Sequence, residues 1–237
     1  MKRLVILVLI MSCMQIQAQD SSELIKHYEA YYKQMRSQGD VQGIINGLTH
    51  LNLLKPSEAR KDTLAYIYMS EGKEAQALNT IGIELKLDDS DIALQVKAVC
   101  LKGVGQPEKA LLQFTEMFRR DPNAPIAYEM AELNMQTQKF TEAKKHVDYG
   151  LANSTDEMVK GFYETQAPYQ VPLKAAFLYL DGLITFNQNK TVNVDAAIDI
   201  FDEALKLAPN FNMAQVGKNA LLQQKQAAAQ QVQQPKN

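Results

Sequence analysis

Residues 91–123, DIALQVKAVCLKGVGQPEKALLQFTEMFRRDPN, contain the pattern that decides the fold of this chain. Apolar side chains recur there every three or four residues, as at Leu94, Ala98 and Leu101, which is the spacing of one buried helix face. A second run with this spacing follows after a glycine-containing turn. It stops at Pro122, because proline cannot continue a helix and restricts the residue before it. The stretch therefore predicts two helices joined by a turn.

The same pattern returns along the chain with a period of 33 residues. Positions that share a column are Ala65, Ala98 and Ala131; Ala77, Ala110 and Ala143; Gly39, Gly72 and Gly105; and Leu48, Ile81, Phe114 and Val147. Because alanine is small, the two alanine columns would let paired helices approach closely. A fixed period of this length is typical of repeat proteins, in which each helix pair stacks on the next.

The repeat resembles the tetratricopeptide repeat (TPR) family, whose helix-turn-helix unit has small residues, glycine and proline at fixed places. Counted from Asp91, the matching residues of the third unit are Ala98, Gly105, Ala110, Phe114 and Pro122. The resemblance implies an all-α fold, an α-solenoid of about five such units with a C-terminal capping helix. In two respects the chain departs from the family, since it has no tryptophan and places Lys97 at a usually apolar position.

The register of the repeat predicts the domain boundaries. We expect units near 25–57, 58–90, 91–123 and 124–156, an insertion over 157–171, a fifth unit over 172–211, a capping helix over 212–222 and a Gln/Ala-rich tail over 223–237. The first unit has Tyr32 and Ile44 where alanine is expected, which indicates an edge repeat. For the insertion we expect a helix and a loop. For the tail we expect a partial extension of the last helix, followed by disorder.

Residues 1–18 have the order of a secretory signal peptide, with two basic residues, an apolar run and a small residue at the cleavage site. Cleavage after Ala18 predicts export to a bacterial periplasm and a mature chain that begins at Gln19. The segment that ends at Cys13 also resembles the lipobox of bacterial lipoproteins, and its lipidation would hold the protein at the outer membrane. Removal of Cys13 leaves Cys100 as the sole thiol of the folded part, so no intramolecular disulfide is expected.

Composition and motifs argue against several classes of function. Hydrophobic residues make up 46% and charged residues 22% of the 237 positions, with a net charge of −2, which excludes wholesale disorder and gives no electrostatic basis for binding nucleic acid. His27 and His50 fall in the first expected unit and His146 in the fourth, without metal-ligand spacing. We therefore predict no catalysis, no cofactor and no metal. Cys100 is interpreted as a small buried hydrophobe, and the acidic run 88–91 as a solvated turn in which Ser90 or Asp91 caps the next helix.

Function is then expected on the surface. In TPR proteins the first helices line a concave groove that holds partner segments, and the resemblance implies which residues face it. These are Lys33, Arg36, Asp62, Tyr66, Met69, Gln95, Val99, Lys102, Tyr128, Glu132 and Met135. Tyrosine, methionine and scattered charge suit an extended or helical peptide. The alternative is that Tyr66 and Met69 pack against neighbouring helices or the insertion.

The leading hypothesis is a non-catalytic protein-protein interaction scaffold of the bacterial envelope, whose partner is a protein or peptide. Membrane contact is expected only if Cys13 is lipidated. Two alternatives remain open: a lipid-anchored subunit of an outer-membrane assembly complex, and an envelope hydrolase or hydrolase activator that uses the insertion.

Overall fold

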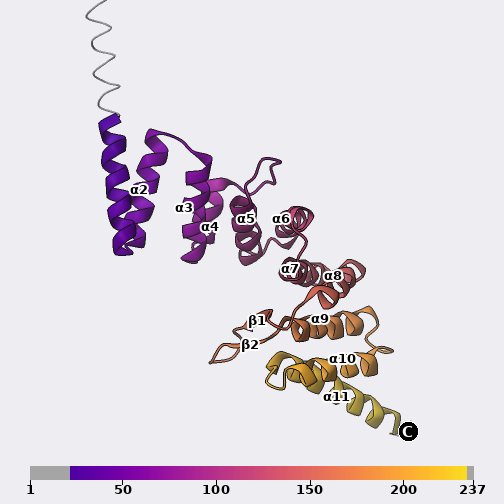
Figure 1. The fold of residues 1–237 in the computed structure, drawn as a ribbon. Helices are drawn as coiled ribbons and strands as arrows, with labels where there is room; N and C mark the ends of the chain where they lie inside the picture. Colours follow the sequence, from indigo (N-terminus) through magenta and orange to yellow (C-terminus); the bar gives the residue numbers. More distant parts are fainter. Residues whose placement is uncertain (1–21, 234–237) are drawn as a thin grey trace, which may run out of the picture. The chain divides into compact units, whose positions relative to one another are not determined.

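The structure is a computed structural model that describes residues 22–233. The predicted signal segment and Cys13 lie outside the described residues, as do residues 234–237 of the predicted tail. Over the described range, the chain is a succession of helices joined by short turns, with one two-stranded sheet (Figure 1). The chain divides into two compact units, Met1–Gln106 (unit 1) and Pro107–Asn237 (unit 2). The division falls within the predicted repeat unit 91–123.

Unit 1 contains consecutive helices that pack on one another, with contacts between α3 and α4, between α4 and α5, and between α3 and α5. Its helices are one over residues 22–38, α2 (Val41–Leu54), α3 (Glu58–Ser70), α4 (Glu74–Ile81) and α5 (Asp91–Gly103). Side-chain caps start several of them, because the first backbone N–H groups of a helix lack partners within it. Asp40 accepts from the N–H of Gly43 at 2.9 Å, and Ser90 accepts from the N–H of Ala93 at 3.0 Å.

The glycine column of the sequence is a column of left-handed turn residues. Gly39, Gly72 and Gly105 have φ angles of +70°, +66° and +71°, and a Cβ atom at any of them would meet nothing within 4 Å. Their conformation, and not close packing, therefore requires glycine. Gln138 holds the fourth position of the column and keeps the same backbone conformation, with φ of 59°.

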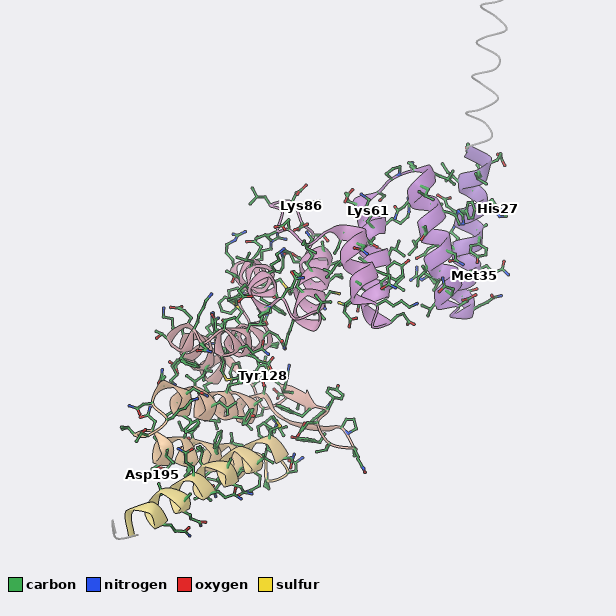
Figure 2. All side chains as sticks on the ribbon, turned by 180° about the vertical axis from the view of Figure 1, so that it is seen from behind. His27, Met35, Lys61, Lys86, Tyr128 and Asp195 are labelled. Atoms are coloured by element: carbon green, nitrogen blue, oxygen red, sulfur yellow. The ribbon has the colours of Figure 1, made fainter. Side chains whose placement is uncertain are left out.

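The first helix pair packs around glycine on its second helix, in place of the alanine column. A Cβ atom on Gly47 of α2 would lie 3.1 Å from Cβ of Tyr32, and one on Gly43 would overlap the side chain of Met35 (Figure 2). The large Tyr32 thus fits because Gly47 opposite it is small. This exchange of sizes explains how the predicted edge repeat tolerates tyrosine at a position that holds alanine elsewhere.

Unit 2 holds two closely packed helix pairs, α7 with α8 and α9 with α10, while α11 packs on α10. Its helices are α6 (Pro107–Arg120), α7 (Ala124–Gln136), α8 (Phe140–Asn153), α9 (Leu173–Gln188), α10 (Val194–Leu207) and α11 (Asn212–Gln233). The main core cluster of this unit contains Tyr128, Phe177, Phe201 and Phe211.

Both alanine columns are buried completely. The relative exposure is 0% for Ala65, Ala98, Ala131, Ala77, Ala110 and Ala143. The packing role inferred from the period of 33 is therefore confirmed, and the fold class is all-α apart from one short hairpin. Among the described residues, no helix combines the length and the apolar character needed to cross a bilayer.

The insertion is a β-hairpin, so the predicted helix and loop are wrong. Strand β1 (Val159–Phe162) pairs antiparallel with β2 (Tyr169–Pro172), and Phe162 lies opposite Tyr169. Aromatic and β-branched side chains favour strands. A two-stranded sheet is marginal by itself. This one is held by tertiary contacts, because Val171 is buried and the ring of Phe162 lies 4.8 Å from that of Phe211.

The last helix continues beyond its predicted end at residue 222. It runs to Gln233, so the expected extension of the helix into the tail covers residues 223–233. Alanine and glutamine are good helix formers, which explains the continuation. The extension is tied back to its neighbours, since Lys225 pairs with Asp195 at 2.7 Å and the Gln224 amide donates to the carbonyl oxygen of Lys190 at 3.2 Å.

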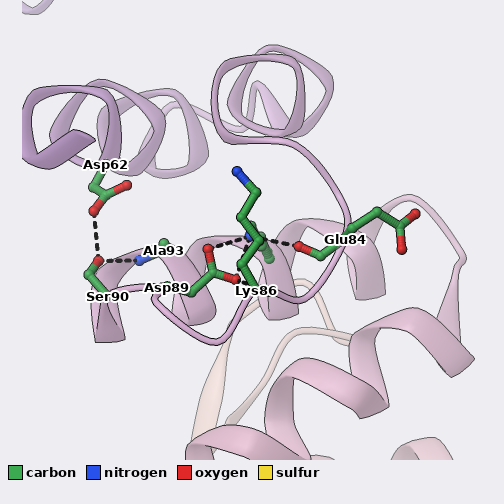
Figure 3. A network of polar contacts seen from close by, with 7 residues as sticks. Asp62, Glu84, Lys86, Asp89, Ser90 and Ala93 are labelled. Atoms are coloured by element: carbon green, nitrogen blue, oxygen red, sulfur yellow. Dashed lines mark hydrogen bonds and ion pairs between the residues drawn. The ribbon is translucent and has the colours of Figure 1, made fainter. Parts of the chain in front are cut away.

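A buried ion pair organises the connection over residues 82–90 in unit 1 (Figure 3). The fully buried ammonium group of Lys97 lies 2.6 Å from both carboxylate oxygens of Asp89 and 2.8 Å from the carbonyl oxygen of Glu84. The Asp89 side chain is only 7% exposed, so the expectation of a solvated turn is wrong for this residue. Ser90 caps α5, as expected. The unusual lysine thus binds the loop that precedes its own helix.

Candidate partner-binding site

The predicted groove residues lie in three different environments. Lys33, Arg36, Tyr66, Gln95 and Val99 are exposed; Met69, Lys102, Glu132 and Met135 are partly buried; Asp62 and Tyr128 are buried. The face of the first helices is therefore available in part, and two of the predicted residues serve the interior of the fold. Each unit presents its own portion of this face.

In unit 1 the exposed portion is apolar. Tyr66 on α3 is 43% exposed, and Ile92 and Val99 on α5 are 45% and 42% exposed. Helices α3 and α5 pack side by side, and Ile92 and Val99 are two turns apart on the same face of α5. Gln95 lies between them at helical spacing and is also exposed. We call Tyr66, Ile92, Gln95 and Val99 the unit 1 face.

Asp62 is buried and does not belong to the unit 1 face. Its Oδ2 accepts a hydrogen bond of 2.7 Å from the hydroxyl of Ser90, whose oxygen accepts in turn from the N–H of Ala93 (Figure 3). The side chain therefore supports the cap of α5 from a neighbouring helix. Sequence reasoning could identify Ser90 as a cap. It could not identify Asp62, 28 residues earlier, as the acceptor for the hydroxyl proton.

In unit 2 the partly exposed portion leads to a hollow. The hollow has a volume of about 340 Å³, and Met135 of α7 lies at its edge. The lining residues are Met135, Gln138, Phe140, Leu183, Asn187 and Lys190. Gln138 is strained, because a non-glycine residue at φ of 59° is disfavoured, and such strain often accompanies binding sites. Leu183 and Asn187 on α9 were missed from the sequence, since the insertion shifts the register of the fifth unit.

Tyr128 is an interior residue, 2% exposed, and not a groove contact. Its ring meets that of Phe177 edge to face at 5.4 Å between centroids, and the ammonium group of Lys160 lies 4.5 Å from its centroid. Tyr128 thus lies beside the first strand of the hairpin (Figure 2). Burial raises the pKa of its hydroxyl well above the usual value, with smaller contributions from Glu132 and Glu129. The insertion covers this position, which the period alone could not show.

A second hollow of about 510 Å³ lies among α6, α7 and α8. His146 is one of its lining residues and meets the ring of Phe118 edge to face at 5.9 Å. Burial lowers the pKa of His146 below its usual value of 6.5, and the charge of Glu142 opposes this shift. The site is aromatic and apolar on one side, so it disfavours the charged imidazole.

This shift predicts a pH dependence of stability. A histidine whose pKa is lower in the folded state stabilises the fold above its usual pKa, and that contribution is lost as the pH falls from about 6.5 through the folded pKa. His146→Gln removes this titration. We expect the urea midpoint of the variant to fall less between pH 7.5 and pH 5 than that of the parent chain. An unchanged pH dependence would contradict the inference that partial burial favours the neutral form of His146.

Other candidates for chemistry are dispersed. Cys100 is a free, fully buried thiol, and burial raises its pKa to about 11, which makes it a poor nucleophile. The ring of His50 stacks on that of Tyr28 at 4.2 Å, while His27 meets Tyr28 edge to face. Within residues 22–233, no three histidine, cysteine, aspartate or glutamate side chains are grouped so that they could hold a metal ion.

The helix pairs, alanine columns and turn glycines define an α-solenoid built from helix-turn-helix repeats, and solved structures share this architecture. YrrB, a TPR protein with an unusual peptide-binding site, has a TM-score of 0.64 at 13% identity, over 81% of this chain and 90% of its own. A tetratricopeptide repeat protein from Parabacteroides merdae has a TM-score of 0.60 at 19% identity, over 86% and 72%. MamA has a TM-score of 0.58 at 16% identity, over 78% and 92%.

The chain therefore has the fold of the tetratricopeptide repeat proteins, which confirms at the level of the fold the resemblance seen in the sequence. No family model matches the sequence, and no curated protein matches it. At these identities the likeness is one of fold, so function must be argued from the residues of this chain.

Proposed function

We propose that the protein is a non-catalytic scaffold that binds a segment of a partner protein on the face of its first helices. The observation that carries this proposal is the unit 1 face, where Tyr66, Ile92 and Val99 are each more than 40% exposed on helices that pack together. Large apolar side chains that share a surface mark interaction sites more often than single ones do. Tyrosine adds a rigid, amphipathic contact of the kind that dominates interfaces.

The proposal predicts a contact that site-specific crosslinking can detect. With the photoreactive residue benzoylphenylalanine at position 99, irradiation in the native host should yield a discrete adduct with a partner. The additional change Tyr66→Ala should reduce its yield by about tenfold, because truncating a central aromatic contact typically costs 1–2 kcal/mol. Mass spectrometry of the adduct then identifies the partner.

Leu53 supplies the matched control, since it is 77% exposed on α2 of the same unit and does not belong to the unit 1 face. The crosslinker at position 53 should not give the adduct obtained at position 99. Equal adducts at both positions, or a yield that Tyr66→Ala leaves unchanged, would contradict the proposal. Circular dichroism of each variant verifies that the helices are retained. Tyr128 is unsuitable for such a test because it is buried.

We further propose that the scaffold acts in a bacterial envelope. Support comes from the order of residues 1–18, which is that of an export signal. Intact-mass analysis of protein from the native host would show a chain beginning at Gln19 if signal cleavage follows Ala18. A chain beginning at an acylated Cys13 would instead support the lipid-anchored alternative. An unprocessed chain would contradict both.

A further inference from the structure

The contact between the hairpin and α7 has the composition of a binding site for an organic cation. The ammonium group of Lys160 donates to Oε1 of Glu129 at 2.7 Å and lies 4.5 Å from the ring centroid of Tyr128. A carboxylate beside an aromatic face is a common arrangement for holding a lysine or arginine side chain. The Lys160 and Glu129 side chains are 28% and 22% exposed, so solvent reaches the pair.

The hairpin does not depend on Lys160 for its place in the fold. The ring of Phe162 lies 4.8 Å from Phe211, and Val171 is 1% exposed. Opposite Phe162 in the hairpin, the hydroxyl of Tyr169 donates to Glu164 at 2.5 Å and accepts from the N–H of Met213 at 3.4 Å. None of these contacts involves the Lys160 side chain. The cation over Tyr128 can therefore be exchanged while the strands stay in place.

The same location offers two further polar groups. These are the hydroxyls of Tyr128 and Tyr179, residues that are only 2% and 9% exposed. Both hydroxyls lie within electrostatic range of the Glu132 carboxylate, whose charge contributes to the raised pKa of each. A tyrosine hydroxyl can donate a hydrogen bond to an acceptor such as a peptide carbonyl.

Helix α7 connects this contact to Met135, which lines the hollow described above. Tyr128, Glu132 and Met135 are spaced by four and three residues, so they follow one face of α7. With a rise of 1.5 Å per residue, Tyr128 and Met135 are about 10 Å apart along the helix, which equals about three residues of an extended chain. An extended segment along α7 would thus reach both places with side chains three positions apart.

We propose that Tyr128, Glu129 and Glu132 form a site for a lysine or arginine side chain of an extended partner segment, and that Lys160 occupies it until the partner replaces it. An apolar side chain three positions from the basic residue enters the hollow at Met135. The inference rests on the proposed scaffold function and specifies the partner as a basic segment. Lys160 is then an intramolecular competitor, whose high effective concentration keeps weaker or neutral segments out.

The test uses the fluorescein-labelled peptide Leu-Ser-Ser-Arg-Ser-Ser-Leu, which has a leucine three positions from arginine on either side and so suits either chain direction. A second peptide, the methionine twin, has methionine in place of arginine. Lys160→Met removes the competing charge but keeps an unbranched side chain. Measured by fluorescence anisotropy, the variant should bind the arginine peptide at least about tenfold more tightly than the parent chain does. Its affinity for the methionine twin should not rise. Glu129→Gln, added to Lys160→Met, should abolish the gain.

Lys206→Met provides the matched control, because Lys206 is an exposed lysine on α10 of the same unit. It makes the same change of net charge and should leave the affinity for both peptides unchanged. The inference is overturned if Lys160→Met binds the arginine peptide no better than the parent, binds both peptides equally, or binds neither. Helicity by circular dichroism verifies that each variant is folded.

The results of the peptide-binding test and of the crosslinking test on unit 1 distinguish the basic-segment site from the scaffold function. A partner adduct at position 99 together with an ineffective Lys160→Met change leaves the scaffold function standing and rejects the basic-segment site. Failure of both experiments rejects the scaffold function itself. Increased peptide binding without an adduct at position 99 supports the cation site and moves the partner contact from the unit 1 face to α7.

Discussion

Replacing Asp89 with alanine should lower the free energy of unfolding of unit 1 by about 3–5 kcal/mol, as expected when one partner of a buried ion pair is removed. The fully buried ammonium group of Lys97 would keep only the carbonyl oxygen of Glu84 among the acceptors described above. An uncompensated charge in that position costs far more than an exposed ion pair contributes. Urea-induced unfolding followed by circular dichroism measures the loss.

Asp88 is the matched control for this experiment, since it is the exposed neighbour of Asp89. Asp88→Ala should change the stability by no more than about 0.5 kcal/mol. Replacing both partners, as in Lys97→Met with Asp89→Leu, should recover most of the loss because no charge is then buried. If Asp89→Ala and Asp88→Ala have similar effects, the ion pair does not hold the loop over residues 82–90.

The substitution Gly150→Ala should destabilise unit 2 by about 3 kcal/mol, the upper part of the range for overpacked cores. A Cβ atom at this position of α8 would overlap the ring of Phe177, which is fully buried and packs edge to face on Tyr128. Alanine is worth only about 1 kcal/mol more than glycine inside a helix, so the steric cost decides the sign. The urea midpoint of the purified variant measures the effect.

Gly103 gives the opposite expectation for the same chemical change. It is a helical glycine of α5, and its added Cβ would meet the nearest atom, Cγ of Glu74, at 3.4 Å, an ordinary contact. Gly103→Ala should therefore leave stability unchanged or raise it by up to about 1 kcal/mol. Phe177→Leu should relieve part of the cost of Gly150→Ala. Equal effects at positions 150 and 103 would show that the ring does not require glycine.

Much of the fold could be predicted because its determinants are local and repeated. The alanine columns, the turn glycines and the cap at Ser90 each depend on neighbours within one or two turns of helix or on the period itself. The hairpin could not be predicted in this way. Its strands pair with each other, and Phe162 contacts Phe211, which is 49 residues farther along the chain.

The candidate site was predictable to a smaller degree. The exposed positions Tyr66 and Val99 follow from the register, because equivalent residues of repeated helices share a face. Asp62 and Tyr128 share a column with the exposed Gln95 and yet are buried. Their environments come from Ser90 and Lys160, partners 28 and 32 residues away, and the period carries no information about such individual contacts.

The sequence by itself determined that this protein is a stack of helix pairs, since spacing, small residues and turn glycines recur wherever the same local geometry is needed. Only the tertiary structure decided which portions of the first-helix face are open. The reason is physical, because the exposure of a side chain depends on what packs over it. The hairpin that covers Tyr128 and the loop that Lys97 binds through Asp89 each join segments of unlike sequence. No repeat pattern encodes them.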